Sequence, residues 1–299
     1  MHLMCVGVAR AMAERGDQSL DVVFSETMAG EIFAFGVSEP SNDWVLQGSK
    51  TTAVPQEDGG YLLSGVKIFT SLSPVWTRLI THGLDSTDDT LVYGFLERST
   101  EGITVSDRWD VMGMRASHSR ATILENARML PSRVVRKVPA GRHPDLLTFA
   151  ITCNFQLLVG SVYAGVARRA LDLAVAGLKA RKSAKSGTTY AEVPEFRARL
   201  SDAYRDYLAV PAQLELYSRD FDDLVDHGAG WPLRLVAARL AASDAARSAA
   251  ETAMMCASGS GFDNSHELSR LYRDATAGLF HPPSADAARP MYAAALLDD

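Results

Sequence analysis

The N-terminal stretch of the chain has apolar residues at helical spacing. Leu3, Val6 and Ala9 follow one another at intervals of three residues, which favours one face of a helix. A second short helix is predicted from Leu20 to Met28. Residues 1–28 are therefore expected to form a small helical segment.

From about residue 30, short β-rich runs alternate with polar turns such as Glu-Asp-Gly-Gly at residues 57–60. The predicted strands are Glu31–Val37, Tyr61–Phe69, Thr77–Gly83, Thr90–Leu96, Ile103–Ser106 and Ala121–Leu124. Several short strands at this spacing suggest a small sandwich or barrel. A linker is expected after them, marked by Pro131, Pro139, Gly141 and Pro144.

Beyond this linker the pattern is helical. The predicted helices are Leu146–Ala180, Glu192–Tyr217, Pro232–Ala257 and Glu267–Ala277, with a short last helix after Ala285. The first of these is apolar all round, as a buried helix is, and Pro211 predicts a kink in the second. The third is rich in alanine, and small residues let helices pack closely in a bundle.

The predicted fold class is α+β, in three parts. Residues 1–28 form a helical segment, residues 29–140 a β-sandwich or barrel domain, and residues 141–299 a four-helix-bundle domain.

Composition narrows the function classes. A hydrophobic content of 47% and a charged content of 22% are typical of a globular protein. The net charge of −6 disfavours nucleic acid as a partner, because phosphate binding needs a basic face. No apolar run of the roughly 18 residues that span a bilayer and no signal peptide are recognised, so no membrane site is expected. Widely spaced Cys5, Cys153 and Cys256 indicate a reduced, cytoplasmic compartment and no metal site.

Residues 35–40 read Phe-Gly-Val-Ser-Glu-Pro and resemble the x-x-[ST]-E-P strand and turn of the acyl-CoA dehydrogenase superfamily, a family of flavoproteins. In that family the hydroxyl and nearby backbone N–H groups hold the pyrimidine edge of the flavin, where reduced flavin carries negative charge. The resemblance implies that Phe35, Val37 and Ser38 bind the cofactor, with Ser38 as the side-chain donor. Taken alone, these residues would be a strand that ends before a turn.

Residues 65–71 read Gly-Val-Lys-Ile-Phe-Thr-Ser and are similar to the family's G-x-K-x-[WF]-[IT]-[TS] segment. There the aromatic ring covers the flavin and a hydroxyl bonds near its reactive nitrogen. The resemblance gives these roles to Phe69 and to Ser71 or Thr70, although a plain strand with a core Phe would look the same. Residues 112–117 resemble a further family segment, whose arginine, here Arg115, packs rather than reacts.

A glycine-containing turn makes the fourth match. Residues 257–262 read Ala-Ser-Gly-Ser-Gly-Phe and, with Arg-Leu-Tyr-Arg-Asp-Ala at residues 270–275, resemble the family's G-G-x-G-[YF] … R-x-x-R-D pattern. In the family a neighbouring subunit lends this turn to the FAD, so Gly259 and Gly261 are predicted to approach the cofactor. The family's Arg-x-x-Phe-Gly, which also reaches a neighbour's FAD, survives only as Arg181. A homodimer or homotetramer is implied.

The chain departs from the family where dehydrogenation needs a base. Pro282 stands at the position of the glutamate that removes a thioester's α-proton, and Phe155 lies near the alternative position of that base. Asp286 is the nearest later acid. Trp44 falls where a serine contacts the thioester, and it is the predicted substrate residue. The family's N-terminal helical domain is almost wholly missing, which suggests a shortened protein or a wall supplied by a partner.

Residues 273–281 read Arg-Asp-Ala-Thr-Ala-Gly-Leu-Phe-His and resemble the R-[DN]-A-x-x-x-x-[LF]-H run of the superfamily's flavin monooxygenase branch. The resemblance makes His281 the catalytic residue, because a neutral imidazole can hydrogen-bond to a reacting group and move its proton near pH 7. The alternative is a helix-end histidine that bonds the last carbonyls.

The resemblance implies a flavin-dependent oxidoreductase with FAD, or alternatively FMN, between the β domain and the bundle. Three functions stay open. These are oxidation of the Cα–Cβ bond of an acyl thioester, monooxygenation by reduced flavin and oxygen with His281, and a non-catalytic subunit that completes a partner's flavin site. The expected partners are a small-molecule substrate such as an acyl-CoA, a flavin reductase or electron-transfer flavoprotein, and further copies of the chain.

Overall fold

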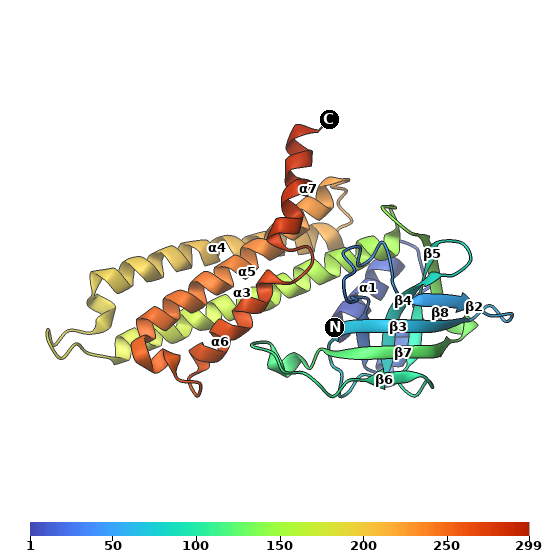
Figure 1. Ribbon diagram of the computed structural model, residues 1–299. Coiled ribbons are helices and arrows are strands. Elements are labelled where there is room, and N and C mark those ends of the chain that lie inside the picture. Colours follow the sequence, from blue (N-terminus) through green and yellow to red (C-terminus); the bar gives the residue numbers. More distant parts are fainter. Residues whose placement is uncertain (299) are drawn as a thin grey trace. The chain divides into compact units, whose positions relative to one another are not determined.

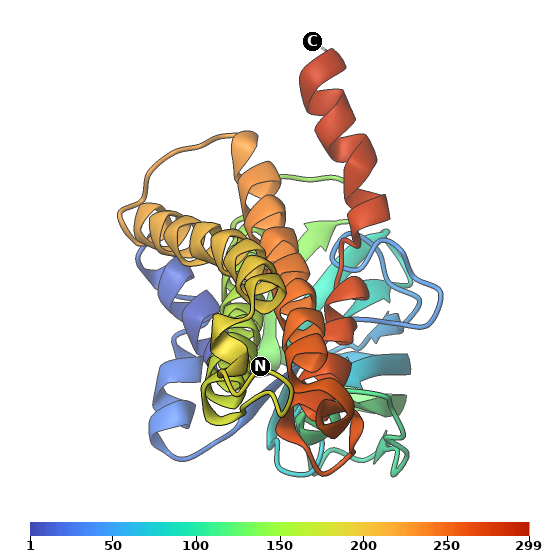
Figure 2. The same ribbon diagram turned by 90° about the vertical axis from the view of Figure 1, so that its left-hand side faces the viewer.

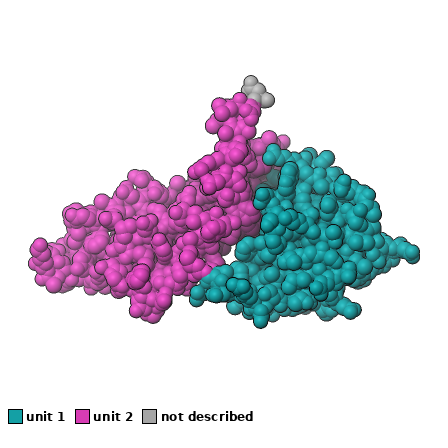
Figure 3. Space-filling model, viewed as in Figure 1, with its two compact units in different colours: residues 1–111, 115–154 teal, residues 112–114, 155–299 magenta. Residues whose placement is uncertain are grey.

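The computed structural model describes residues 1–298, and the chain divides into two compact units (Figure 3). Unit 1 comprises residues 1–111 and 115–154, and unit 2 comprises residues 112–114 and the chain from residue 155 onward. The β-sheet lies in unit 1 and the long helices belong mainly to unit 2 (Figure 1).

The N-terminal helices of unit 1 confirm the helical pattern of this segment. They are α1 (His2–Ala13) and α2 (Val22–Met28). The buried side of α1 carries Met4, Val8 and Met12, whereas Leu3 of the predicted stripe is 72% exposed. The helix is tied to the sheet at its start, because the Phe33 N–H donates to His2 Nδ1 at 3.1 Å.

Within the described residues, eight strands of unit 1 form one mixed sheet. The strands are β1 (Phe33–Gly36), β2 (Thr52–Pro55), β3 (Tyr61–Thr70), β4 (Arg78–Asp85), β5 (Thr90–Glu97), β6 (Ile103–Val105), β7 (Arg120–Met129) and β8 (Val134–Pro139). Their order is β6-β7-β3-β2-β4-β5-β8, with β1 paired to β4 off this path. The pairs β1/β4 and β2/β4 are parallel and the other pairs are antiparallel.

The sheet curls around a buried apolar core. The core includes Leu63, Trp76 and Leu79. β5 and β7 are separated by β3, β2 and β4 in the strand order, yet they meet, since a Cβ placed on Gly94 would lie 2.5 Å from Met129 Sδ. The α+β class is therefore confirmed, and the β part is one curled sheet.

Two strands were not predicted. β8 occupies the segment that the prolines had marked as a linker, and this part of the linker assignment is wrong. Its residues pair with β5 up to Thr90 and Pro139, so Pro139 stands at the strand end, where a missing N–H does no harm. β2 gives little apolar signal, because its fully buried residue, Ala53, has a small side chain. β7 is also longer than expected, and Asn126 in its middle has a φ of 53°.

The bundle of unit 2 is built from long helices that lie side by side in both views (Figures 1 and 2). The helices are α3 (Leu146–Ala180), α4 (Pro194–Asp222), α5 (Gly230–Ala257) and α6 (Glu267–Thr276), followed by α7 (Ala285–Leu297). α3 begins in unit 1 and continues through unit 2. Close packing depends on small residues, since a Cβ on Gly160 would lie 3.6 Å from the Arg239 Cα of α5.

α3 corrects one expectation about membranes. Among residues 1–298 it is a helix long and apolar enough, by length and composition, to cross a bilayer, although no such run was recognised in the sequence. Uncharged polar residues such as Thr152, Asn154 and Gln156 interrupt the apolar run and hide it. Half of its most apolar stretch is buried inside the structure, as in the core helix of a bundle.

Candidate functional site

The end of β3 carries an exposed aromatic ring on a strained backbone. The β3/β7 register shifts between Lys67 and Thr70, and between them Phe69 has a φ of 57°. This left-handed conformation is rare for bulky residues and is typically found where function requires it. The ring is 59% exposed, and its edge meets Trp109 at a centroid distance of 6.4 Å. The bulge therefore presents a flat aromatic surface.

Hydroxyl groups follow directly after this ring. Ser71 Oγ lies 2.7 Å from Ser119 Oγ, which lies 2.8 Å from Ser117 Oγ. Thr70 is fully buried, and its Oγ1 has no hydrogen-bond partner within the described residues. A buried hydroxyl without a partner is costly. This one faces β1 and not solvent, since a Cβ placed on Gly36 would lie 3.2 Å from it.

The residues after β1 lie against the same part of β3. The Ile68 N–H donates to the Ser38 carbonyl oxygen at 2.8 Å, so Ser38 is brought beside the bulge. Phe35 and Val37 are buried, and Phe35 lines a small apolar cavity of unit 1 together with Ile80. The structure thus brings Ser38, Phe69, Thr70 and Ser71 together, whereas the side chains of Phe35 and Val37 belong to the core.

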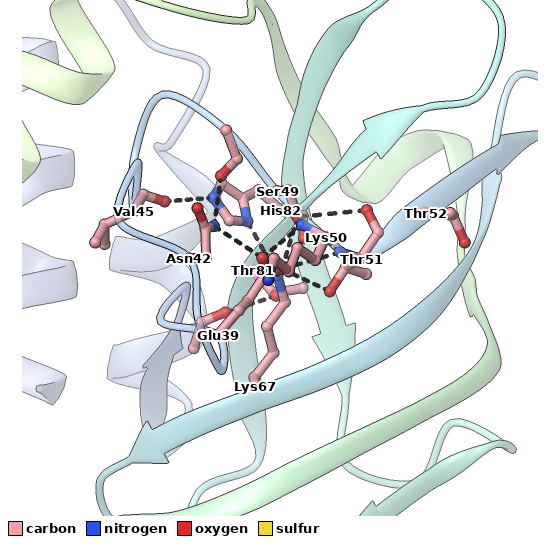
Figure 4. Close-up of polar contacts among 12 residues, drawn as sticks. Glu39, Asn42, Val45, Ser49, Lys50, Thr51, Thr52, Lys67, Thr81 and His82 are labelled. Carbon is pink, nitrogen blue, oxygen red and sulfur yellow. Dashed lines mark hydrogen bonds and ion pairs between the residues drawn. The ribbon is translucent and has the colours of Figure 1, made fainter.

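A buried ionic network supports this region (Figure 4). Lys67 donates to Glu39 Oε1 at 2.5 Å, to the His82 carbonyl oxygen at 2.7 Å and to His82 Nδ1 at 3.1 Å. These three bonds use all three donors of the ammonium group. His82 Nε2 lies 2.8 Å from the Val45 carbonyl oxygen, so the ring carries its proton on Nε2 and accepts at Nδ1.

Glu39 also gathers the loop that follows it (Figure 4). Its carboxylate accepts from Asn42 Nδ2 at 2.9 Å, Ser49 Oγ at 2.6 Å and the Lys50 N–H at 2.6 Å. The Thr51 N–H and Oγ1 donate to it as well, at 3.1 and 2.7 Å. One carboxylate thus closes the loop between β1 and β2.

The network is charged at neutral pH apart from its histidine. Burial alone would raise the pKa of Glu39, but the Lys67 charge and the hydrogen bonds from Lys50 and Ser49 hold it well below its usual value. Burial lowers the pKa of Lys67 to about 8, against the opposite pull of Glu39. Burial and the Lys67 charge lower the pKa of His82 to about 3, so its ring is neutral.

Trp44 lies on the loop that Glu39 closes. Trp44 is 54% exposed, and its backbone N–H donates to Asn42 Oδ1 at 3.1 Å. Its predicted contact with a substrate stays a prediction.

In unit 2, Arg181 lies beside the predicted glycine turn. Its Nη1 donates to the carbonyl oxygens of Cys256 and Ala257, both at 3.0 Å, where α5 ends. The turn that follows, residues 258–262, places Gly259 at an exposed position where a Cβ would meet nothing within 4 Å. Gly261 is buried, and a Cβ there would lie 2.9 Å from the Ala257 Cβ. The structure brings these three predicted residues together, with Arg181 engaged by the helix end.

His281 is held against one face of α3. Its Nε2 lies 2.8 Å from the Tyr163 hydroxyl, and its ring packs edge-on against Tyr163 and Phe155 at centroid distances of 5.6 and 6.1 Å. These two residues are about two helical turns apart, so they lie on one side of α3. Burial, helped by the charge of Arg239, lowers the pKa of His281 to about 4, and the imidazole is neutral at pH 7.

The loop after His281 is clamped from the bundle. Arg239, fully buried on α5, donates through Nε to Gln156 Oε1 at 2.9 Å and through Nη2 to the Pro283 carbonyl oxygen. Gln156 Nε2 donates to the Pro282 carbonyl oxygen at 3.1 Å. Among the residues that the structure describes, Arg239 Nη1 has no partner. The clamp holds the backbone next to His281 in place.

No carboxylate is found at the three positions where a dehydrogenase base was considered, all of which are described. Pro282 and Phe155 cannot take up a proton through their side chains. The Asp286 side chain is 84% exposed and pairs with Arg289 at 2.5 Å, so it points to solvent. His281 is the titratable side chain that forms a hydrogen bond to this face of α3, through the Tyr163 hydroxyl.

Two domain families match the sequence. Residues 34–127 match Acyl-CoA dehydrogenase, middle domain, and residues 157–283 match Acyl-CoA dehydrogenase, C-terminal domain. The chain belongs to the acyl-CoA dehydrogenase superfamily. The structure of butyryl-CoA dehydrogenase from Megasphaera elsdenii superposes on it with a TM-score of 0.83 at 20% identity, over 97% of this chain and 74% of that one. The acyl-CoA dehydrogenase fold is therefore shared.

Curated relatives of this chain include a nitrososynthase and a monooxygenase by name. L-evernosamine nitrososynthase from Micromonospora sp. is 28% identical over 229 residues, which cover 75% of this chain and 54% of that protein. Dibenzothiophene monooxygenase from Rhodococcus qingshengii is 30% identical over 150 residues, 46% of this chain and 34% of that protein. The chain thus spans about half the length of the nitrososynthase.

The superfamily motifs pointed to some of the buried polar residues and not to others. Glu39 and Lys67 lie inside the quoted Ser-Glu-Pro and Gly-x-Lys segments, but the sequence analysis gave them no role. Gln156 and Arg239 are polar residues within otherwise apolar helix stretches, a signal that could have been used. Tyr163 carries no such signal, because a tyrosine in an apolar helix is ordinary core.

Proposed function

We propose that this chain acts as a flavin-dependent oxidoreductase and, within that class, as a monooxygenase. One oxygen atom of O₂ would enter the substrate and the other would leave as water, while reduced flavin becomes oxidised. The observation that carries the proposal is His281. A neutral imidazole is held against α3, next to the position where the dehydrogenases of the superfamily have a carboxylate.

The bulge of unit 1 fits a planar cofactor such as FAD or FMN. Phe69 offers an exposed ring, and Ser38 and Ser71 offer groups that can hydrogen-bond to a ring edge. In unit 2, the open position of Gly259 allows close approach of a phosphate-bearing group. When bound, the reduced flavin would supply the two electrons of the reaction.

The role of His281 follows from its neutral state. A neutral imidazole can hydrogen-bond to an oxygen of the reacting group without adding a buried charge. Hydrogen bonds aimed at a site of developing charge can lower a barrier by several kcal/mol, about 3 in typical cases. The names of two relatives, a nitrososynthase and a dibenzothiophene monooxygenase, support oxygen transfer. A separate reductase is the expected source of reduced flavin.

The test is isotope incorporation by the purified chain loaded with FMN or FAD. The flavin is reduced chemically, then mixed with ¹⁸O₂ and either a primary amino sugar or dibenzothiophene. We expect ¹⁸O in the product, and we expect His281→Ala to lose the product while it still binds flavin. His143→Ala, a change at an exposed histidine, is the matched control and should keep full activity.

Other outcomes separate the remaining functions. Acyl-CoA oxidation at Cα–Cβ is the second candidate, because both matching domain families carry the dehydrogenase name. Anaerobic bleaching of bound flavin by an acyl-CoA, without any ¹⁸O product, would overturn the monooxygenase proposal in its favour. A chain that binds no flavin would instead favour a non-catalytic subunit.

A further inference from the structure

The direction of the hydrogen bond between Tyr163 and His281 can be inferred from the burial of the phenol. Tyr163 is fully buried, and its hydroxyl lies 2.8 Å from His281 Nε2. Among the described residues, His281 Nε2 is the hydrogen-bond partner found for this hydroxyl. Burial raises the pKa of Tyr163, so the phenol keeps its proton.

A buried phenol O–H that donates to nothing is strongly disfavoured. If His281 carried its proton on Nε2, the Tyr163 oxygen would accept it, and the phenol proton would turn to a direction in which the described residues give it no hydrogen bond. If Nε2 is unprotonated, it accepts the phenol proton and the buried Tyr163 hydroxyl is satisfied. In a neutral ring the remaining proton must then lie on Nδ1.

We propose that Tyr163 is a positioning residue that holds neutral His281 in the Nδ1–H tautomer, so that the ring offers a donor to a bound substrate or cofactor. This inference rests on the proposed function for its catalytic meaning, although the tautomer itself can be measured without any reaction.

The tautomer limits what His281 can do. Its Nδ1–H can donate a hydrogen bond to an oxygen that gains negative charge, but Nδ1 cannot accept a proton. A proton could enter the ring only at Nε2, which Tyr163 occupies. The positive charge of buried Arg239 also disfavours protonation of the ring, since it lowers the pKa of His281. His281 is therefore a hydrogen-bond donor in this reaction and not its base.

The Gln156–Arg239 clamp gives this arrangement its rigidity. It holds the carbonyl oxygens of Pro282 and Pro283, directly after His281. On the other side, Gly278 lets the preceding turn approach α5, because a Cβ there would lie 2.9 Å from the Ser243 Cβ. The backbone is held on both sides of His281, and Tyr163 then sets the ring.

The first test is a long-range ¹H–¹⁵N correlation spectrum of the ¹⁵N-histidine-labelled chain at pH 7.5. The His281 signals are those missing from the spectrum of His281→Gln. We expect one pattern in which Nδ1 is protonated and Nε2 is not. Free histidine in water favours the opposite tautomer, so this result would require a local cause. An Nε2–H pattern or an even mixture in the wild type would overturn the proposal.

The second test removes the hydroxyl alone. Tyr163→Phe keeps the ring packing, and we expect the His281 pattern to shift toward Nε2–H. The rate of ¹⁸O incorporation should fall about tenfold, with KM changed by less than about twofold, as expected when one hydrogen bond is lost from the reacting arrangement. Tyr204→Phe is the matched control, because Tyr204 is 46% exposed and stacks on Tyr207. An unchanged tautomer in Tyr163→Phe would overturn the proposal.

The two proposals fail separately. If the tautomer behaves as expected but His281→Ala keeps full oxygenation, the assignment to Tyr163 holds and the catalytic role of His281 is wrong. If His281→Ala is inactive but the wild-type ring is Nε2–H, the proposed function holds and Tyr163 has no positioning role.

Discussion

Each unit of the molecule contains a neutral histidine beside a buried cation, and the two arrangements differ in how completely they are satisfied. In unit 1, Lys67 is paired with Glu39, and both ring nitrogens of His82 have partners. In unit 2, Arg239 Nη1 has no partner within the described residues, and the hydrogen bond found there for the ring of His281 is the one at Nε2. The first arrangement is closed and the second is open.

This difference separates structure from chemistry. A buried group whose every donor and acceptor is used can hold a loop, but it has nothing left to offer a ligand. The network around Glu39 therefore closes the loop between β1 and β2 and supports the strand that carries Phe69. The cluster around His281 keeps one ring nitrogen available, which a catalytic residue needs. Figure 4 shows the closed case, with several donors converging on Glu39.

The largest effect should come from breaking the closed network. Glu39→Gln leaves the Lys67 cation buried without its counter-charge, and loss of one partner of a buried pair costs about 3–5 kcal/mol. We expect the free energy of unfolding, measured by urea denaturation, to fall by about that amount. Glu57→Gln, at an exposed carboxylate, is the control and should change it by less than about 0.5 kcal/mol.

A second variant makes this result specific to the pair. Glu39→Gln combined with Lys67→Met removes both charges, and it should recover part of the loss because no unpaired ion remains. If Glu39→Gln proved as stable as the wild type, the network would not be what holds the loop, and the distinction between closed and open arrangements would be wrong.

The same contrast explains what could be predicted from the sequence. Helical spacing predicted α3 with its observed ends, because apolar residues recur along its whole length and it contains no proline. The motifs around Ser38, Phe69 and His281 identified residues that local sequence marks. β2 and β8 were missed because their pairing is decided by distant strands and not by their own weak patterns.

Tyr163 and Arg239 were missed for a related reason. Their importance comes from partners more than 40 residues away, His281 and Pro283, and no local pattern encodes such a contact. Arg239 could be seen in the sequence as a charged residue in an alanine-rich helix, but its partner Pro283 could not. Contacts between distant segments therefore limit what sequence can show of this site, more than the chemistry of the individual residues does.

An effect of intermediate size should appear in the pH dependence of stability. The folded-state pKa of His281 is about 4, below the unfolded value of about 6.5, so the unfolded chain binds a proton that the folded chain does not. Stability from this group is present above pH 6.5 and is lost as the pH falls toward 4. Between pH 7.5 and pH 5 the loss from His281 should be about 2 kcal/mol.

His281→Gln isolates this contribution. The wild type also loses stability through His82, whose pKa is lowered to about 3, so the measured quantity is the difference between the two urea series. We expect the wild type to lose about 2 kcal/mol more than the variant over this pH range. Parallel pH profiles would mean that His281 is solvated in the folded chain, and the open cluster would not be buried as described.

The smallest effect on stability should come from Phe69. Its backbone is strained and its ring is exposed, whereas His281 has an available ring nitrogen. A left-handed φ of 57° costs a phenylalanine but not a glycine, and the exposed ring contributes little burial. Phe69→Gly should therefore leave the free energy of unfolding unchanged or raise it by up to about 1 kcal/mol.

Flavin affinity of Phe69→Gly, measured by fluorescence quenching, should fall about tenfold if the ring stacks on the cofactor. Asp89→Gly, at another exposed position with a φ of 53°, offers the same backbone relief away from the bulge and should keep its flavin affinity. A Phe69→Gly protein that is clearly less stable yet binds flavin normally would show that the strained ring serves the fold and not a ligand.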